Sequence, residues 1–407
     1  MELIIQKYGG SSLASPQNIR EAAQRVVRRS QQGVRLVVVV SAMGDTTDDL
    51  IELAHQVSAR PDGRDLDLLI STGETVSAAL LSMALKSLGQ DAISLSGAQA
   101  GIQTDGYYSQ AHILDINSQR MERELARSKV VVVAGFQGIE RTSEDVTTLG
   151  RGGSDTTAVA LAARLKAKIC EIYTDVEGIY TADPRVVPEA RKLSEIDYEE
   201  MLELASYGSK VIHPRAVEIG KLYQIPILVA GSGSQSCGTL ILEGVNMEAK
   251  NKVRGVTFDM DVAKITVVGI PDKPGIVTSL FEPLARSNIN VDTIVQNASV
   301  QGITDLTFTV SRGDTEKTLE IILPVTESIK AQKVVHSTNL GKVSIVGVGM
   351  QNAPGYAARM FHTLYEAGVN IELITTSEIR ITCIVEEDKI PTAVRSLHRA
   401  FELEKED

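Results

Sequence analysis

Runs of consecutive aliphatic residues alternate with helical patterns along the first part of the chain. Helical patterns cover Pro16–Ser30, Ser71–Leu88 and Ser154–Lys166. The strand-like runs are Leu3–Gln6, Leu36–Val40, Ala92–Leu95, Val130–Ala134, Ile169–Thr174 and Pro226–Val229. Several of these runs lack polar alternation, as expected for strands that are covered on both faces. The pattern therefore predicts an α/β fold with a mostly parallel sheet sandwiched by helices.

Composition limits the partners that such a chain can bind. With 407 residues, the chain has room for two or three domains. Tryptophan is absent and hydrophobic residues make up 43%, so Val, Ile, Leu and Ala must build the core. The formal net charge of −11 argues against nucleic acid or an anionic membrane as the main partner.

The cysteines and the N-terminal residues indicate a cytoplasmic protein. Cys170, Cys237 and Cys383 are odd in number and far apart, which fits reduced thiols. The chain does not start with a basic segment followed by a long apolar stretch, so no signal peptide is expected. No apolar run is expected to span a membrane.

A second pattern begins after about Gly244, where two similar units follow each other. Pro274-Gly275 recurs as Pro354-Gly355, and Asn290 recurs as Asn370, each after 80 residues. Repetition at this scale indicates duplicated domains. Each unit reads strand, helix, strand, strand, helix, which is close to a ferredoxin-like βαββαβ pattern.

The second repeat lacks a final strand, because its tail after residue 401 is short and polar. Residues 253–259 are strand-like and have no place in the first repeat, so we expect them to fill this open edge. The predicted organisation is a first domain at 1–245, a linker with this strand at 246–263, and repeats at 264–337 and 342–407.

Two loops combine glycines with a basic residue. Lys7-Tyr8-Gly9-Gly10-Ser11-Ser12 lies between the first strand and a helix, where a backbone can approach phosphate and Lys7 can neutralise its charge. An ordinary turn with a solvated lysine is the alternative. In Leu149–Thr157, Arg151 offers a fork that matches a carboxylate, and Ser154 or Asp155 can cap the next helix.

Three further loops are candidates, and two of them, Ser41–Thr47 and the loop with Glu74, lie where open α/β sheets bind ligands, beyond the carboxyl ends of strands. Tyr173–Pro184 has Asp and Tyr residues for a ribose and base, although by itself this segment is better explained as a surface loop. Ser41–Thr47 ends a strand, and Glu74 opens a helix, where it could bind an ammonium group or simply complement the helix dipole.

Some motifs are absent from the sequence. There is no Walker GxxxxGK[ST], no GxGxxG after the first strand, no HRD or DFG, and no zinc-ligand spacing. The lone His213 favours a structural role.

Together, the motifs resemble the aspartokinase branch of the amino acid kinase family. KYGGSS, VVVVSAMGDTTDDL, STGE, VAGFQG, TTLGRGGSDTTA, IYTDVEGIYTADPR and SYGSKVIHPRA follow that family's order and spacing, and the tail resembles its paired ACT domains. The resemblance implies an aspartate kinase that uses ATP with Mg²⁺, makes 4-phospho-L-aspartate towards lysine, threonine and methionine, and has no metal site of its own.

The resemblance also implies site residues. Catalysis would involve Lys7 and Asp155. Aspartate would be bound by Ser41, Thr47, Glu74, Arg151, Gly152, Gly153 and Ser154. ATP would be bound by Lys7, Tyr8, Gly9, Gly10, Ser11, Tyr173, Thr174, Ile179, Tyr180, Thr181, Ala182, Asp183, Pro184, Ser209 and Lys210.

Two other functions remain open at this point. One is another carboxylate kinase of the same superfamily, acting on glutamate or acetylglutamate; the duplicated tail and the SAMGDTTDDL and RGGSDTT loops disfavour it. The other is a non-catalytic amino-acid sensor, which intact Lys7, Glu74 and Arg151 disfavour.

The repeats predict effector sites for lysine, threonine or both. In each repeat a Pro-Gly loop leads to a helix N-terminus, which suits a ligand carboxylate, and an acidic residue nearby suits an ammonium group. Paired ACT domains imply a homodimer or higher oligomer. The predicted effector residues are Asp272, Lys273, Pro274, Gly275, Ile276, Val277, Asp292, Gln296, Asn297, Asn352, Ala353, Pro354, Glu372, Thr375 and Thr376.

Overall fold

A computed structural model describes residues 1–234, 236–244, 252–297, 302–350 and 353–405. The chain divides into two compact units. The first comprises Met1–Tyr180 and Lys192–Glu248, and the second comprises Thr181–Arg191 and Ala249–Asp407.

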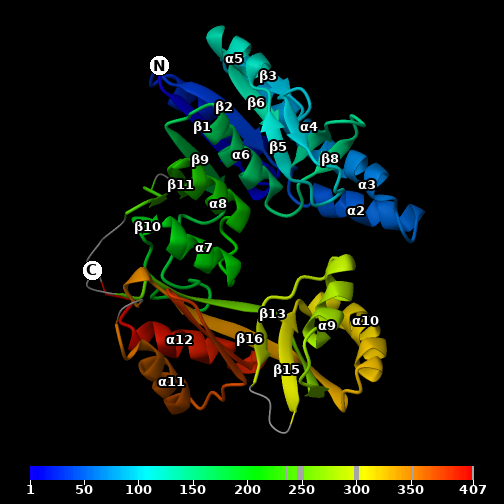
Figure 1. Ribbon diagram of the computed structural model, residues 1–407. Helices are drawn as coiled ribbons and strands as arrows, with labels where there is room; N and C mark the ends of the chain where they lie inside the picture. The colour runs from blue at the N-terminus through cyan, green and yellow to red at the C-terminus, as the bar shows by residue number, and fades with distance from the viewer. Residues whose placement is uncertain (235, 245–251, 298–301, 351–352, 406–407) are drawn as a thin grey trace. The chain divides into compact units, whose positions relative to one another are not determined.

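The first unit is built on a sheet with the strand order β10-β12-β11-β9-β1-β2-β6-β3 (Figure 1). Among the described strands, neighbours run parallel except β11 and β12, so the predicted mostly parallel sheet is confirmed. The strands are β1 (Leu3–Tyr8), β2 (Arg35–Val40), β3 (Ala92–Leu95), β6 (Val130–Ala134), β9 (Ile169–Thr174), β10 (Glu195–Asp197), β11 (Ile227–Gly231) and β12 (Thr239–Leu242).

Helices cover both faces of this sheet. Apolar residues of α1 (Pro16–Ser30) and α4 (Thr72–Ser87) share a core with Ile4 and Tyr8 of β1. Because side chains alternate along a strand, Lys7 points to the other face, where α6 (Gly153–Arg164) packs against β1, β2 and β9. The three predicted helices are thus confirmed. The other helices are α2 (Thr46–Val57), α3 (Gly63–Ile70), α5 (Gln119–Ala126), α7 (Tyr198–Ser206) and α8 (Pro214–Tyr223).

A smaller sheet of the first unit was not predicted. Its order is β5-β4-β7-β8, from β4 (Ile102–Thr104), β5 (Ile113–Ile116), β7 (Gln137–Glu140) and β8 (Val146–Thr148). These strands have only three or four residues each, which is too short for a clear period in the sequence.

The helical stretch from Gly63 to Ser87 qualifies by length and composition alone as long and apolar enough to cross a membrane, contrary to the expectation that no run would be. Half of its most apolar window is buried inside the protein. Asp67 and Glu74 are also buried within this stretch. These features are those of a core helix in a folded unit.

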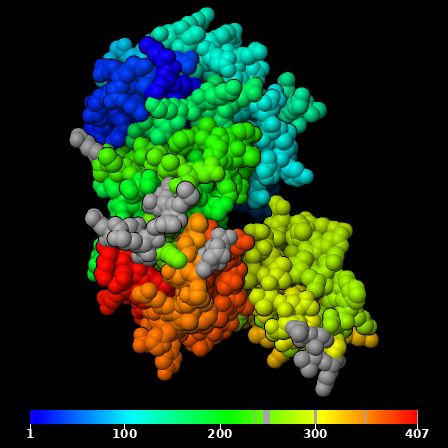
Figure 2. Space-filling model, turned by 60° about the vertical axis from the view of Figure 1, so that its left-hand side comes forward, coloured from blue at the N-terminus to red at the C-terminus, as the bar shows by residue number. Residues whose placement is uncertain are grey.

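The second unit contains one sheet with the order β14-β15-β13-β16-β18-β17. Its strands are β13 (Gly255–Pro271), β14 (Ile294–Gln296), β15 (Ile303–Val310), β16 (Lys333–Val346), β17 (Leu373–Thr376) and β18 (Arg380–Glu386). Its helices are α9 (Ile276–Arg286), α10 (Thr315–Ser328), α11 (Tyr356–Glu366) and α12 (Ile390–Ala400). Figure 2 shows the two repeats as two lobes, yellow for the first and orange to red for the second.

The two long strands β13 and β16 each serve both repeats. Lys264–Val268 of β13 pairs with Lys333–Ser337 of β16 in the first repeat. Gly255–Asp259 pairs with Lys342–Val346, which pairs on its other side with β18 of the second repeat. The early strand therefore fills the open edge of the second repeat, as the missing final strand predicted.

The expected first domain at residues 1–245 needs one correction, because Thr181–Arg191 belongs to the second unit. Ala182 and Val187 lie in the hydrophobic core of the second repeat. The Thr181 carbonyl accepts a hydrogen bond from Val256 N, and its hydroxyl lies 2.9 Å from His398 Nε2. Burial of apolar side chains, rather than position in the sequence, decides where this segment folds.

A charge placed in the exchanged strand should destabilise the second repeat selectively. Val256 is 2% exposed in the core of that repeat, so Val256→Asp buries an unpaired carboxylate. We expect faster hydrogen exchange in β18, α11 and α12 than in α9 and α10. The same change at Val335, which is 47% exposed in β16, is the matched control. Faster exchange confined to α9 and α10 would contradict the shared-strand arrangement.

Candidate active site

Lys7 at the end of β1 forms an ion pair with Asp155 in the first turn of α6. Lys7 Nζ lies 2.6 Å from Asp155 Oδ1, and each side chain is only 11% exposed. The positive end of the helix dipole favours the carboxylate at this position. The lysine charge is therefore held close to the start of α6, next to the glycine turn that follows β1.

The turn after β1 is in direct backbone contact with the end of β9 and with the turn after β2. Gly9 N donates to the Tyr173 carbonyl at 3.1 Å, and Gly44 N donates to the Gly10 carbonyl at the same distance. A Cβ at Gly10 would lie 2.9 Å from the Ala42 carbonyl oxygen, so a side chain would force these turns apart. Glycine at position 10 is thus required by the packing of two loops.

Glu74, at the start of α4, is a buried carboxyl group that forms no ion pair with the residues that the structure describes. Its Oε1 accepts a hydrogen bond from Ala42 N at 3.0 Å, and the side chain is nearly inaccessible. Oε2 is buried and has no hydrogen-bond partner among the described residues. Burial raises the pKa of Glu74 to about 7. A cationic group from a ligand would stabilise the charged form.

The Gly150–Gly153 loop approaches α6 in a conformation that glycine permits. Gly152 has φ +67°, and a Cβ there would lie 2.2 Å from His213 Cβ. Arg151 is exposed at this loop, whereas Ser154 and Asp155 are buried. His213 N lies 3.4 Å from Asp155 Oδ2, and its ring accepts from Arg215 N at 3.3 Å. Burial lowers the pKa of His213, so the ring is a neutral cap of α8, which agrees with the structural role predicted for it.

Two charged residues that the sequence analysis did not single out bind the residues just before this loop. Asp67 is fully buried and accepts hydrogen bonds from Thr148 N, Thr148 Oγ1 and Ser109 N. Arg215 donates to the Leu149 carbonyl at 2.7 Å. The available signal for Asp67 was a charge within the otherwise apolar helical pattern LDLLI.

Phe136, within the VAGFQG motif, was also not singled out. It has φ +66°, a left-handed conformation that is rare for a bulky residue. Its N–H donates to Thr157 Oγ1 of α6, and its carbonyl accepts from Leu149 N. These two bonds stabilise the strained residue between α6 and the loop that carries Arg151.

The predicted substrate residues Ser41 and Thr47 are partly buried in the turn after β2 and in the first turn of α2. Ser11 is exposed after the glycine turn. The strand order brings the carboxyl ends of β9, β1, β2 and β6 side by side. These strand ends and the loops after them carry Lys7, Gly10, Ala42 and Phe136, and open α/β sheets bind ligands at such an edge.

The residues predicted for the nucleotide are divided between the two units. Tyr8 and Tyr173 stack on each other on the α1 face, opposite Lys7, with 5.0 Å between ring centroids. Thr174 and Tyr180 are partly buried, Ile179 is buried, and Lys210 is more exposed than Ser209. Thr181, Ala182, Asp183 and Pro184 belong to the second unit, where the first two are buried.

Comparison with known proteins identifies the family. Residues 2–231 match the model of the amino acid kinase family, and residues 264–325 and 343–401 match ACT domain models. The aspartokinase of Mycolicibacterium smegmatis is 47% identical, with 100% of this chain and 98% of that protein covered. The chain belongs to the aspartokinases of the amino acid kinase family. The aspartokinase of Bacillus sp. strain MGA3 is 48% identical over 99% of this chain and 98% of its own length.

Solved aspartokinase structures share the fold. Escherichia coli aspartokinase III in complex with aspartate and ADP aligns with a TM-score of 0.84 at 25% identity, covering 98% of this chain and 99% of that one. Aspartate kinase from Synechocystis aligns with a TM-score of 0.55 at 45% identity, covering 98% of this chain and 69% of that one. The predicted kinase fold followed by two ACT domains is therefore confirmed.

In the ACT repeats, the two acidic residues predicted to bind effector ammonium groups each pair with a lysine of the other repeat. Glu372 lies 2.6 Å from Lys264 Nζ, and this contact lowers the Glu372 pKa. Asp292 pairs with Lys342 at the corresponding place. Both lysines lie on the first strands of their repeats, so the pairs are reciprocal.

The other predicted effector residues lie mostly at the surface. Asn352 falls outside the described residues. Ile276 and Val277, at the start of α9, are partly buried, as are Ala353 and Thr375. The exposed ones are Asp272, Lys273, Pro274, Gly275, Gln296, Asn297, Pro354 and Thr376.

The titration of Glu74 should appear in the pH dependence of stability. Its pKa rises from 4.5 to about 7 on folding, so the folded state holds a proton that the unfolded state releases between these values. Stability should therefore fall as pH rises through this window, by about 3 kcal/mol. Denaturant titrations from pH 4 to 8.5 should show a smaller fall for Glu74→Gln than for wild type. Exposed Glu52→Gln is the control; equal pH slopes in all three proteins would contradict the assignment.

Proposed function

We propose that this protein transfers the γ-phosphoryl group of ATP to the side-chain carboxylate of L-aspartate, forming 4-phospho-L-aspartate and ADP. The full-length aspartokinase relatives support this assignment. The aspartate and ADP in the E. coli aspartokinase III structure support it further. We place the reaction in the cytoplasm, as the first step towards lysine, threonine and methionine.

One observation carries the proposal: the backbone of Ala42 contacts both Glu74 and the glycine turn after β1. Its N–H donates to the uncompensated Glu74 carboxylate, and its carbonyl borders the Gly10 turn after Lys7. A small amino acid whose ammonium group pairs with Glu74 would therefore lie next to a turn that can hold phosphate. This geometry suits an amino-acid substrate whose own carboxylate is phosphorylated.

Lys7, Asp155 and Arg151 have different roles in phosphoryl transfer. The aspartate carboxylate is itself the nucleophile, so positioning and charge stabilisation are the main requirements. Lys7 stabilises the charge on the transferring group, and Asp155 holds Lys7 in place. Exposed Arg151 binds a substrate carboxylate through its planar fork.

Magnesium enters as a complex with ATP. Within the described residues no group of three or more His, Cys, Asp or Glu side chains is arranged to hold a metal ion. The oxygens of the ATP phosphates would supply most of the ligands of the ion.

Lys7 and Glu74 should affect different kinetic constants. Lys7→Ala should lower kcat about a hundredfold or more, because it removes charge stabilisation in the transition state. Glu74→Ala should mainly raise KM for aspartate, because it removes the partner of the ammonium group. Coupled ADP-release assays with aspartate, glutamate and acetylglutamate measure both effects and the substrate choice. A Lys7→Ala kcat within a few-fold of wild type would refute its role.

The wild-type KM for aspartate should also rise as pH falls below about 7, since protonated Glu74 loses its attraction for ammonium.

We further propose that lysine and threonine inhibit the enzyme by binding the ACT repeats, and that the repeats join at least two chains. Both ACT matches support this, as does the solved E. coli aspartokinase III complex with lysine and aspartate. An effector ammonium group would share Asp292 or Glu372 with the lysine already paired there. Inhibition requires that the effector bind a less active conformation more tightly.

Effector binding can be assigned to a repeat by matched variants. Calorimetry with lysine, threonine and their mixture should show binding to wild type, and Asp292→Asn or Glu372→Gln should weaken the part contributed by its own repeat. Exposed Glu316→Gln is the control. Absence of both binding and inhibition at millimolar lysine plus threonine would overturn the regulatory proposal.

A further inference from the structure

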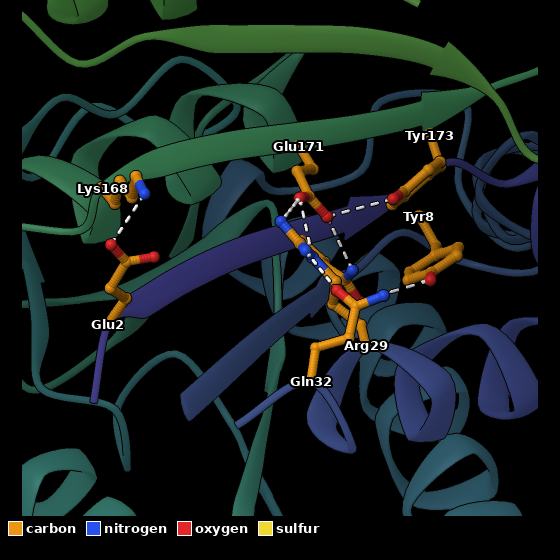
Figure 3. Close-up of polar contacts among 8 residues, drawn as sticks. Glu2, Tyr8, Arg29, Gln32, Lys168, Glu171 and Tyr173 are labelled. Atoms are coloured by element: carbon orange, nitrogen blue, oxygen red, sulfur yellow. Dashed lines mark hydrogen bonds and ion pairs between the residues drawn. The ribbon is translucent and has the colours of Figure 1, made fainter. Parts of the chain in front are cut away.

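A buried polar cluster on the α1 face of the first unit is not used by the proposed chemistry. At its centre is Glu171 of β9, only 3% exposed (Figure 3). Its Oε1 accepts from Arg29 Nε at 3.1 Å and Nη2 at 2.7 Å, and its Oε2 accepts from Gln6 Nε2 at 2.8 Å and from the Tyr173 hydroxyl at 3.0 Å. The carboxylate is fully paired and holds the Tyr173 ring in one orientation.

Tyr173 connects this cluster to the loops at the carboxyl end of the sheet. Its ring stacks on Tyr8, and the guanidinium of Arg25 lies over the ring at 4.7 Å from its centroid. Its backbone carbonyl accepts from Gly9 N in the glycine turn. The residue that follows, Thr174, is the last residue of β9 and leads into the next loop.

Arg25 reaches from α1 to the loop after β11. Its Nη2 donates to the Ser232 carbonyl at 2.7 Å and to the Ser234 carbonyl at 3.0 Å. Ser232 N in turn donates to the Thr174 carbonyl at 2.8 Å. One guanidinium thus fixes the loop after β11, and that loop is bonded to the last residue of β9.

The strand order indicates what these loops face. Glu74 contacts the turn after β2, and the glycine turn follows β1, so amino acid and phosphate occupy the edge over β2 and β1. The nucleoside of ATP must then extend to the other side of β1, over β9 and β11. This step rests on the proposed function.

We propose that Arg25, supported by the Tyr173 ring and Glu171, is a positioning residue for nucleotide binding. It touches neither ATP nor aspartate. It holds the loop after β11, and through it the end of β9, in the conformation that accepts the nucleoside, so its loss should affect ATP and ADP but not aspartate.

The test compares Arg25→Met, Arg25→Lys and Arg28→Met in the full chain. Methionine keeps an apolar stem without the guanidinium, whereas lysine keeps a charge without the planar fork. Arg28 is exposed on the same helix and is the matched control. Steady-state kinetics give kcat and both KM values, calorimetry gives the dissociation constant of ADP, and thermal unfolding reports global stability.

For Arg25→Met we expect KM for ATP and the ADP dissociation constant to rise about tenfold or more, with kcat and KM for aspartate within about twofold. Arg25→Lys should recover part of the loss, and it serves alone if the methionine variant does not fold. Arg28→Met should match wild type. Unchanged ADP binding in both Arg25 variants would overturn the inference, as would equal losses for ATP and aspartate together with lowered thermal stability.

A different result would refute the kinase assignment itself: wild-type protein that binds ADP but releases no ADP from ATP when aspartate is added.

Discussion

Strand β1 lies between β2 and β9 and is covered on both faces, and this constraint organises the first unit. Alternation sends Gln6 and Tyr8 to α1 and Lys7 to α6. The polar residues cannot remain unpaired in such a position, because burying an uncompensated charge is costly. Lys7 therefore pairs with Asp155, and Gln6 pairs with Glu171. A single strand links the proposed phosphate lysine to the cluster that orients Tyr173.

The sequence was sufficient where burial on both faces leaves a strong pattern. The aliphatic runs at Ala92–Leu95 and Val130–Ala134 became strands with the same bounds, and Pro16–Ser30 became a helix with the same bounds. Contacts between residues far apart in the sequence could not be predicted from it. Lys7 and Asp155 were predicted separately, but nothing local to either residue indicates that they meet. Asp67 was missed for the same reason, because its partners lie on other elements.

Duplication of the repeats produces two equivalent contacts between them. Equivalent first-strand lysines, Lys264 and Lys342, each pair with an acid of the opposite repeat. Such partly exposed pairs contribute modestly to stability. Each pair places an acid of one repeat against the first strand of the other repeat, so the two repeats are joined by side chains as well as by the shared strands. Sequence periodicity identified the repeats, but it could not reveal this reciprocity, which depends on how β13 and β16 pair.

The path of the chain limits how the protein can be divided. The backbone passes from the first unit to the second at Thr181, returns at Lys192, and passes over again before Val253. Thr181 and Arg191, the first and last residues of this segment, are hydrogen-bonded to each other. A single cut between Leu242 and Val253 would leave Ala182 and Val187 attached to the wrong piece and strip them from the core of the second repeat. A chimera that exchanges regulatory halves between relatives must therefore exchange residues 181–191 as well.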